Sequence, residues 1–139
     1  MTRRGFTLIE TLACVAIVAV LARGAVLATA SLATTVRVAA CTRTLAQAMR
    51  ETRSRAMAEG TAFEVRFDAA TSRWSIFTDA GTLRRVEPLP PALRFLSLPA
   101  RALIRFTPTG TADNGTIALG AGASSARIVV NQRGRVRLG

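Results

Sequence analysis

The feature that most constrains this chain is a carboxylate inside a long apolar run near its N-terminus. The run covers residues 6–22, follows a short leader containing Arg3 and Arg4, and holds Glu10 as its single acidic residue. An ionised carboxylate in a bilayer costs about 2.5–3.5 kcal/mol on insertion scales, so such a residue is expected to have a functional partner. The natural partner is an amine, because a paired buried charge costs far less than a lone one.

The same run predicts one membrane-spanning helix. A span needs about 20 apolar residues, and residues 24–28 extend the run to that length while Arg23 reaches the interface. Basic residues before the span place the N-terminus in the cytoplasm. We therefore expect a single pass over residues 6–28 through the cytoplasmic membrane, which in a diderm bacterium is the inner membrane, with the rest of the chain then in the periplasm.

The segment Gly5-Phe6-Thr7-Leu8-Ile9-Glu10 resembles the class III signal of type IV pilins and type II secretion pseudopilins. The resemblance implies that a prepilin peptidase removes residues 1–5 as a leader peptide, cutting after Gly5 and methylating Phe6. It also implies that Glu10 neutralises the N-terminal amine of a neighbouring subunit while the helices stack into a filament. The alternative is an ordinary signal anchor that happens to contain a glutamate.

The helix is expected to continue well beyond the membrane segment. No proline occurs before Pro88, and Gly24 is the only glycine on the way to Gly60, the expected C-terminal stop. Small or apolar residues then recur at three- and four-residue steps, which predicts a face packed on a sheet. These residues are Val38, Cys41, Leu45, Ala48, Met49, Thr52 and Ala56.

The residue types present exclude most catalytic and metal sites. The chain has no histidine and two cysteines, Cys14 and Cys41, which on one helix would lie about 40 Å apart, beyond disulfide reach. No triad, paired-carboxylate site or metal-ligand set can be assembled, so an enzyme is disfavoured and no metal or cofactor is expected. Cys41 is either a free thiol or a small core residue, and the burial habits of cysteine favour the core.

After Gly60 the apolar period changes to two, which predicts an antiparallel sheet assembly. The expected strands cover residues 63–68, 73–78, 83–86, 93–98, 103–107, 116–119, 127–131 and 135–138. Prolines after residue 87 confine the middle segment to edges or loops, and residues 120–125 are expected to form a flexible loop. The core is expected to contain Val65, Trp74, Ile76, Ile128 and Val130. The sequence therefore predicts an α+β, pilin-like fold, with a periplasmic head of residues 29–139 that includes the outer half of the helix.

The C-terminal half resembles the GspH/FimT subgroup of this superfamily. The resemblance lies in Arg73-Trp74, in residues 106–110, and in the closing strands 127–130 and 134–137. The subgroup includes H-type minor pseudopilins of type II secretion and FimT-type minor pilins of type IV pili. It implies a minor subunit at or near the tip of one of these filaments, supporting assembly and secretion, with other minor and major pilins or pseudopilins as partners.

The charge balance points to anionic partners. The formal net charge is +11, and residues 61–139 alone carry 11 arginines against five acidic residues. In the closing strand Arg135 and Arg137 are two residues apart and project from one face, Arg133 extends the row, and Gly134 is expected to let a phosphate approach the backbone.

Two interpretations of these arginines stay open. The Gly-Arg-x-Arg sequence resembles a motif that FimT-type pilins use in DNA uptake, whereas in secretion pseudopilins the same strand only closes the sheet. DNA binding through phosphates would be independent of base sequence and weakened by salt.

Overall fold

The computed structural model describes residues 7–139, and for residues 24–30 it describes the backbone only. Gly5 and Phe6, at the predicted cleavage site, lie outside the described residues, as does the rest of the predicted leader. The chain divides into two compact units, Met1–Ala33 and Thr34–Gly139.

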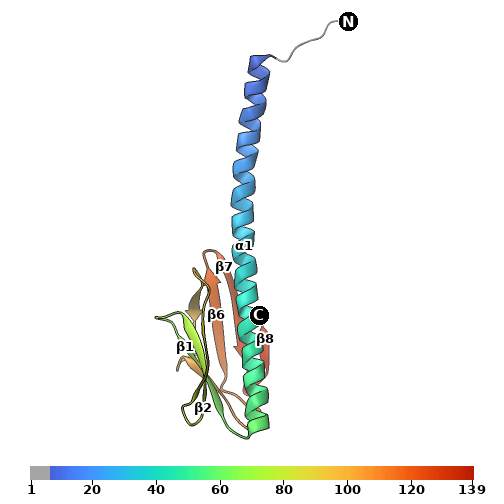
Figure 1. Ribbon diagram of the computed structural model, residues 1–139. Coiled ribbons are helices and arrows are strands. Elements are labelled where there is room, and N and C mark those ends of the chain that lie inside the picture. Colours follow the sequence, from blue (N-terminus) through green and yellow to red (C-terminus); the bar gives the residue numbers. More distant parts are fainter. Residues whose placement is uncertain (1–6) are drawn as a thin grey trace. The chain divides into compact units, whose positions relative to one another are not determined.

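One long helix, α1 (Leu8–Glu59), contributes to both units (Figure 1). In the first unit its large apolar side chains are exposed, from 80% at Leu8 to 60% at Ile17. Among the described residues, no helix combines the length and the apolarity that crossing a membrane requires. The predicted span of residues 6–28 includes Phe6 and five residues without described side chains, and it stays a prediction.

The outer half of α1 packs against the sheets through the predicted face. The seven residues predicted for this face are buried, except Cys41, which is half-buried against the core. Thr42 and Thr52 tolerate burial because their hydroxyls donate to the carbonyl oxygens four residues earlier, both at 2.7 Å. The helix ends at Glu59, and Gly60 adopts a φ of +64°, as expected of a glycine C-terminal stop.

The second unit contains two four-stranded antiparallel sheets. The first has the order β3-β2-β1-β5, with β1 (Phe63–Asp68), β2 (Arg73–Thr78), β3 (Leu83–Pro88) and β5 (Leu103–Phe106). The second has the order β4-β6-β7-β8, with β4 (Arg94–Ser97), β6 (Gly115–Ala121), β7 (Ser124–Val130) and β8 (Val136–Leu138). Each predicted strand is confirmed within a few residues, and the strands on either side of the prolines, β3 and β4, are both edge strands.

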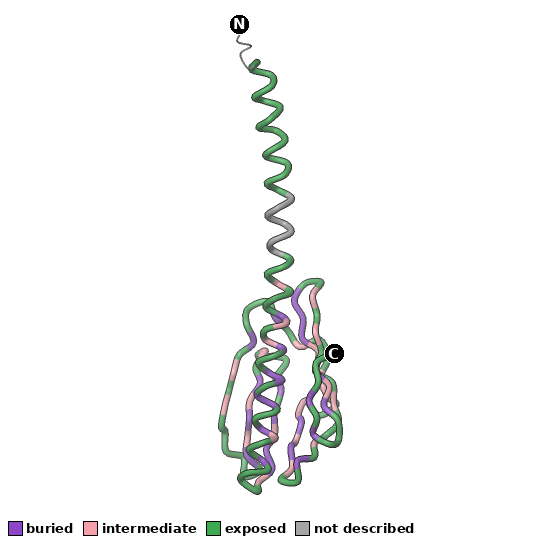
Figure 2. Tube along the Cα trace, turned by 90° about the vertical axis from the view of Figure 1, so that its right-hand side faces the viewer, coloured by how far each residue is buried: buried purple, intermediate pink, exposed green. Residues whose placement is uncertain are grey.

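The core lies where the helix and the two sheets meet (Figure 2). All five predicted core residues are buried, as the period-two pattern required. The Phe67 and Phe95 rings, one from each sheet, pack edge to face with centroids 5.7 Å apart. The α+β prediction is confirmed.

The flexible loop expected at residues 120–125 is wrong. Gly120 and Ala121 end β6, Ser124 begins β7, and only two residues form the turn, with Gly122 at a φ of +57°. Gly120 is buried in the strand, and a Cβ there would lie 2.5 Å from Leu96 Cδ1 and 3.0 Å from the Ser124 carbonyl oxygen. A run of small residues therefore continues the hairpin, although it carries a loop signal.

Candidate functional site

The described helix begins next to the predicted assembly residue. The N–H groups of Glu10 and Thr11 donate to the carbonyl oxygen of Thr7 at 3.1 and 3.2 Å, which sets Glu10 in the first turn. Its side chain is exposed beside Leu8 and Ile9, whose side chains are 80% and 77% exposed. The geometry offers a carboxylate on an otherwise apolar surface, and its pairing with an amine stays a prediction.

The second candidate site is the arginine row at the β7–β8 hairpin, where Arg133, Arg135 and Arg137 are all exposed. The turn that carries them is held by Asn131, whose carbonyl oxygen accepts from the Gly134 N–H at 2.8 Å and whose Oδ1 accepts from the Arg135 N–H at 2.9 Å. Val136 points into the core between Arg135 and Arg137, so these two arginines share the outer face, as the spacing predicted.

Gly134 does not have the role that the sequence suggested. Its N–H is already used in the turn, and the residue is buried with a φ of +70°. A Cβ at this position would overlap the Gly110 carbonyl oxygen and come within 2.6 Å of Arg53 Nε. The expectation that a phosphate approaches this backbone is therefore wrong, because the helix and a neighbouring loop occupy that space.

Two helix arginines join the row, and sequence reasoning missed both. Arg53 Nε donates to the Gly110 carbonyl oxygen at 2.8 Å. The same group lies against Gly134, the residue that separates Arg133 from Arg135 in the sequence. Arg50 Nη2 donates to the Val136 carbonyl oxygen at 3.2 Å. Their positions beside the apolar helix face indicated that they lie near the sheets. Nothing in the local sequence indicated which strand they would contact.

We call these five residues the arginine row: Arg50, Arg53, Arg133, Arg135 and Arg137. None of them forms an ion pair with an acidic side chain in the described part of the chain, where the ion pairs involve Glu59, Glu64, Asp79 and Glu87. Like charges repel when they lie close together, so an anion at this surface relieves the repulsion. Guanidinium groups in such a row suit phosphate oxygens, which accept paired N–H donors.

The other candidate residue, Cys41, behaves as a core residue. Burial raises the pKa of its thiol above the ordinary value of 9.0, so the thiolate is disfavoured at neutral pH. Both cysteines are free thiols. Among the described residues, no three Cys, Asp or Glu side chains are grouped to hold a metal ion.

Comparison with known proteins gives two matches to family models. A model of type II transport protein GspH matches residues 42–134, and a model of the prokaryotic N-terminal methylation motif matches residues 1–23. No curated protein sequence matches the chain.

Solved structures agree on the fold. The chain is similar to the minor pseudopilin EpsH of the Vibrio cholerae type 2 secretion system, with 17% identity, a TM-score of 0.62, and coverage of 74% of this chain and 96% of that one. It is also similar to the type IV minor pilin FimU of Pseudomonas aeruginosa, with 19% identity, a TM-score of 0.62, and coverage of 73% and 87%. The expected pilin-like fold is confirmed.

Proposed function

Because this chain belongs to the GspH family of type II transport proteins, we propose that it is a minor subunit at or near the tip of a type II secretion pseudopilus or a type IV pilus. In this role it helps to start filament assembly and thereby supports secretion. The observation that carries the proposal is the exposed apolar surface of residues 8–23, with Glu10 as its one carboxylate.

This surface has to be covered, first by lipid and then by neighbouring helices. Moving an apolar helix between these two environments changes its apolar burial little, so the subunit can leave the inner membrane for the filament. Glu10 makes the exchange favourable, because its carboxylate is costly in lipid and is neutralised by an amine in the assembly. Cleavage after Gly5 by a prepilin peptidase would create that amine at Phe6.

The test is Glu10→Gln, which keeps the size of the side chain and removes its charge. We expect normal membrane insertion but about a tenfold loss of co-purification with the other pilin-like subunits, the loss that corresponds to one ion pair of about 1.4 kcal/mol. Thr11→Val, one residue further along the same turn, is the control and should assemble normally. Assembly of Glu10→Gln at the wild-type level would contradict the proposed role of this carboxylate.

A second candidate function is DNA binding during natural transformation, and the arginine row supports it. Arg50 and Arg53 reach the hairpin that exposes Arg133, Arg135 and Arg137, and none of the five is paired with an acid in the described chain. Nothing in the row is arranged to read base edges, so contacts would go to phosphates. Such binding is independent of sequence and loses affinity steeply with salt.

The test for DNA binding is a gel shift at several salt concentrations with the full chain in detergent. Arg135→Gln/Arg137→Gln removes two phosphate contacts. The negative slope of log K against log salt concentration should therefore become about 1.8 less steep on duplex DNA. Arg94→Gln/Arg101→Gln removes the same charge from exposed positions elsewhere and should keep the wild-type slope. Equal loss in both variants would show that net charge, rather than the arginine row, binds DNA.

A further inference from the structure

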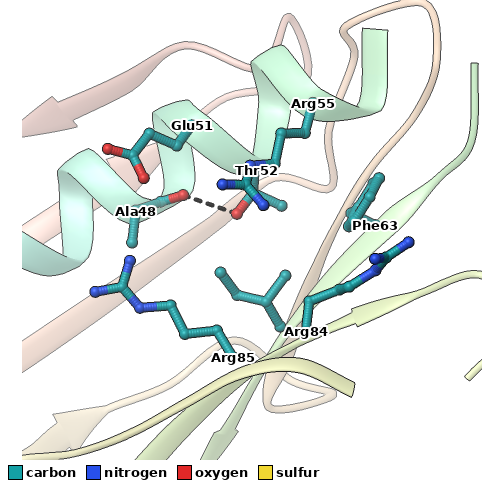
Figure 3. A pocket seen from close by; sticks show the side chains of 8 residues that line it. Ala48, Glu51, Thr52, Arg55, Phe63, Arg84 and Arg85 are labelled. Atoms are coloured by element: carbon teal, nitrogen blue, oxygen red, sulfur yellow. Dashed lines mark hydrogen bonds between the residues drawn. The ribbon is translucent and has the colours of Figure 1, made fainter. Parts of the chain in front are cut away.

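A pocket of about 120 Å³ lies between α1 and the first sheet (Figure 3). Glu51 and Arg55 line it from the helix, and Arg84 and Arg85 line it from β3. Phe63 adds an apolar side. Three arginine side chains and one glutamate thus line a space large enough for a single side chain.

A second pocket, of about 300 Å³, lies along the same border of α1 and β3. Arg37 and Cys41 line it from the helix, and Trp74, Pro88 and Pro90 line it from the sheet side. The helix positions that line the two pockets follow one another at three- and four-residue steps from 37 to 55, so they form a single stripe. The two pockets therefore follow one another along about 27 Å of the helix at 1.5 Å per residue, and we call this border of α1 and β3, with its two pockets, the helix–strand groove.

Arg85 stands where the two pockets meet. It lines the first pocket, while its guanidinium donates to Glu87 Oε1 at 2.9 Å and lies 5.2 Å from the centre of the Trp74 ring. Glu87 and Trp74 both line the second pocket. Among the described residues, Arg85 has one ion pair, to Glu87, and one ring contact, to Trp74, and both partners line the second pocket.

The groove carries cations that the described chain leaves unpaired. Neither Arg37 nor Arg55 forms an ion pair with a described acidic residue, and Arg84 reaches its nearest one, Glu59, at only 3.9 Å. Glu51 is the one carboxylate here without an ion pair. The balance of the groove is positive, so it complements an acidic occupant.

The strand beside the groove also has a free backbone edge. Within residues 7–139, β3 pairs only with β2, and the Leu89 N–H bonds to the Ser72 carbonyl oxygen at 2.8 Å. By the alternation of antiparallel pairs, the N–H and C=O of Val86 then point away from β2. Pro88 has no N–H, so an added strand could pair over only a few residues. An extended segment fits this edge better than a helix does.

A second copy of this chain is a poor occupant. Residues 34–139 carry 16 arginines and seven acidic residues, and Glu59, Glu64, Asp79 and Glu87 are already in ion pairs. Two such heads repel each other, and neither offers a free acidic strand. The complementary segment belongs to a different protein.

Building on the subunit role proposed above, we propose that the helix–strand groove docks an extended acidic segment of a neighbouring pilin-like subunit. One carboxylate lies between Arg55 and Arg84, and an apolar side chain of the same segment lies beside Trp74 in the larger pocket. This docking selects an acidic neighbour, which a chain with so strong a positive charge requires.

Trp74 lines the larger pocket and is the single tryptophan of the chain, so its fluorescence reports binding in the groove. The experiment titrates the full chain in detergent with the acetylated peptide Val-Glu-Val-Glu-Val-Glu and follows the emission of Trp74. We expect a saturable change with this peptide and none with its Val-Lys counterpart. Arg55→Gln/Arg84→Gln should weaken binding about tenfold. Each partly exposed ion pair between an arginine and a peptide carboxylate accounts for about threefold.

Arg43→Gln/Arg94→Gln, which removes two exposed arginines outside the groove, is the matched control and should bind as the wild type does. An unchanged emission maximum of each free variant shows that it is folded. No saturable change, equal weakening in both variants, or the same saturation with free glutamate, which would indicate a small-anion site, would each overturn the proposal. The Glu10→Gln assembly test is independent of this titration, so failure of the groove and failure of the subunit role are told apart.

Discussion

Arg53 on the helix donates a 2.8 Å hydrogen bond to the carbonyl oxygen of Gly110, and the same guanidinium packs against Gly134. One helix side chain thus joins two loops that are separate in sequence. The loops also bond directly, from the Ala112 N–H to the Gln132 carbonyl oxygen at 3.0 Å. The exposed arginines of the hairpin owe their position to this buried junction.

Gly134→Ala should be strongly destabilising, by about 3 kcal/mol, because a Cβ there meets both an unfavourable φ and occupied space. Gly81→Ala is the matched control: its φ is +78°, but no atom lies within 4 Å of the added Cβ, so about 1 kcal/mol is expected. Denaturant unfolding followed by Trp74 emission measures both. Equal losses would show that the close approach to Gly110 and Arg53 contributes nothing.

Arg53→Lys keeps the charge but loses the Nε donor. We expect a loss of about 1 kcal/mol in the free energy of unfolding, since one hydrogen bond to Gly110 disappears and the planar group no longer fills the junction. Arg43→Lys, at an exposed helix position, is the control and should have the denaturation midpoint of the wild type. A wild-type denaturation midpoint for Arg53→Lys would mean that the 2.8 Å bond adds no stability.

Processing of the N-terminus is checked by intact-mass spectrometry of the membrane-derived protein. We expect a chain that begins with methylated Phe6, and we expect Gly5→Leu to retain the leader because the peptidase recognises the glycine at its cutting site. Thr2→Leu, within the leader but away from the cut, should be processed normally. A wild-type protein that still carried residues 1–5 would rule out this assignment.

Stability should fall as the pH rises above about 9, and Cys41 is the cause. Burial raises the pKa of this thiol, so the unfolded chain loses the proton first and alkaline pH favours unfolding. The chain has no lysine, histidine or tyrosine, so thiols and the terminal amine alone titrate in this range. Cys41→Ala should reduce the difference in unfolding free energy between pH 7.5 and pH 10. An unchanged difference would contradict the assignment to this thiol.

Local sequence determined the elements and their inward faces. The three- and four-residue recurrence from Val38 to Ala56 and the alternation around Val65 and Trp74 each state which side chains must leave water, and the structure buries them there. The N-terminal motif is also local, because the predicted cut and the predicted charge pair depend on a few adjacent residues. The loop signal at residues 120–125 failed because four of these six small residues pair across the β6–β7 hairpin, and only Gly122 and Ala123 form its turn.

Tertiary structure alone decided how the flanks of the helix are used. Arg50 and Arg53 lie on one flank and meet the closing hairpin, whereas Arg55 lies on the other and meets β3 across a pocket. An exposed arginine looks the same in sequence whichever strand it meets, since its partners come from segments more than 20 residues away. Burial patterns say that a face is covered, but only the assembled sheets bring together the arginine row, the space that Gly134 leaves for Arg53, and the helix–strand groove.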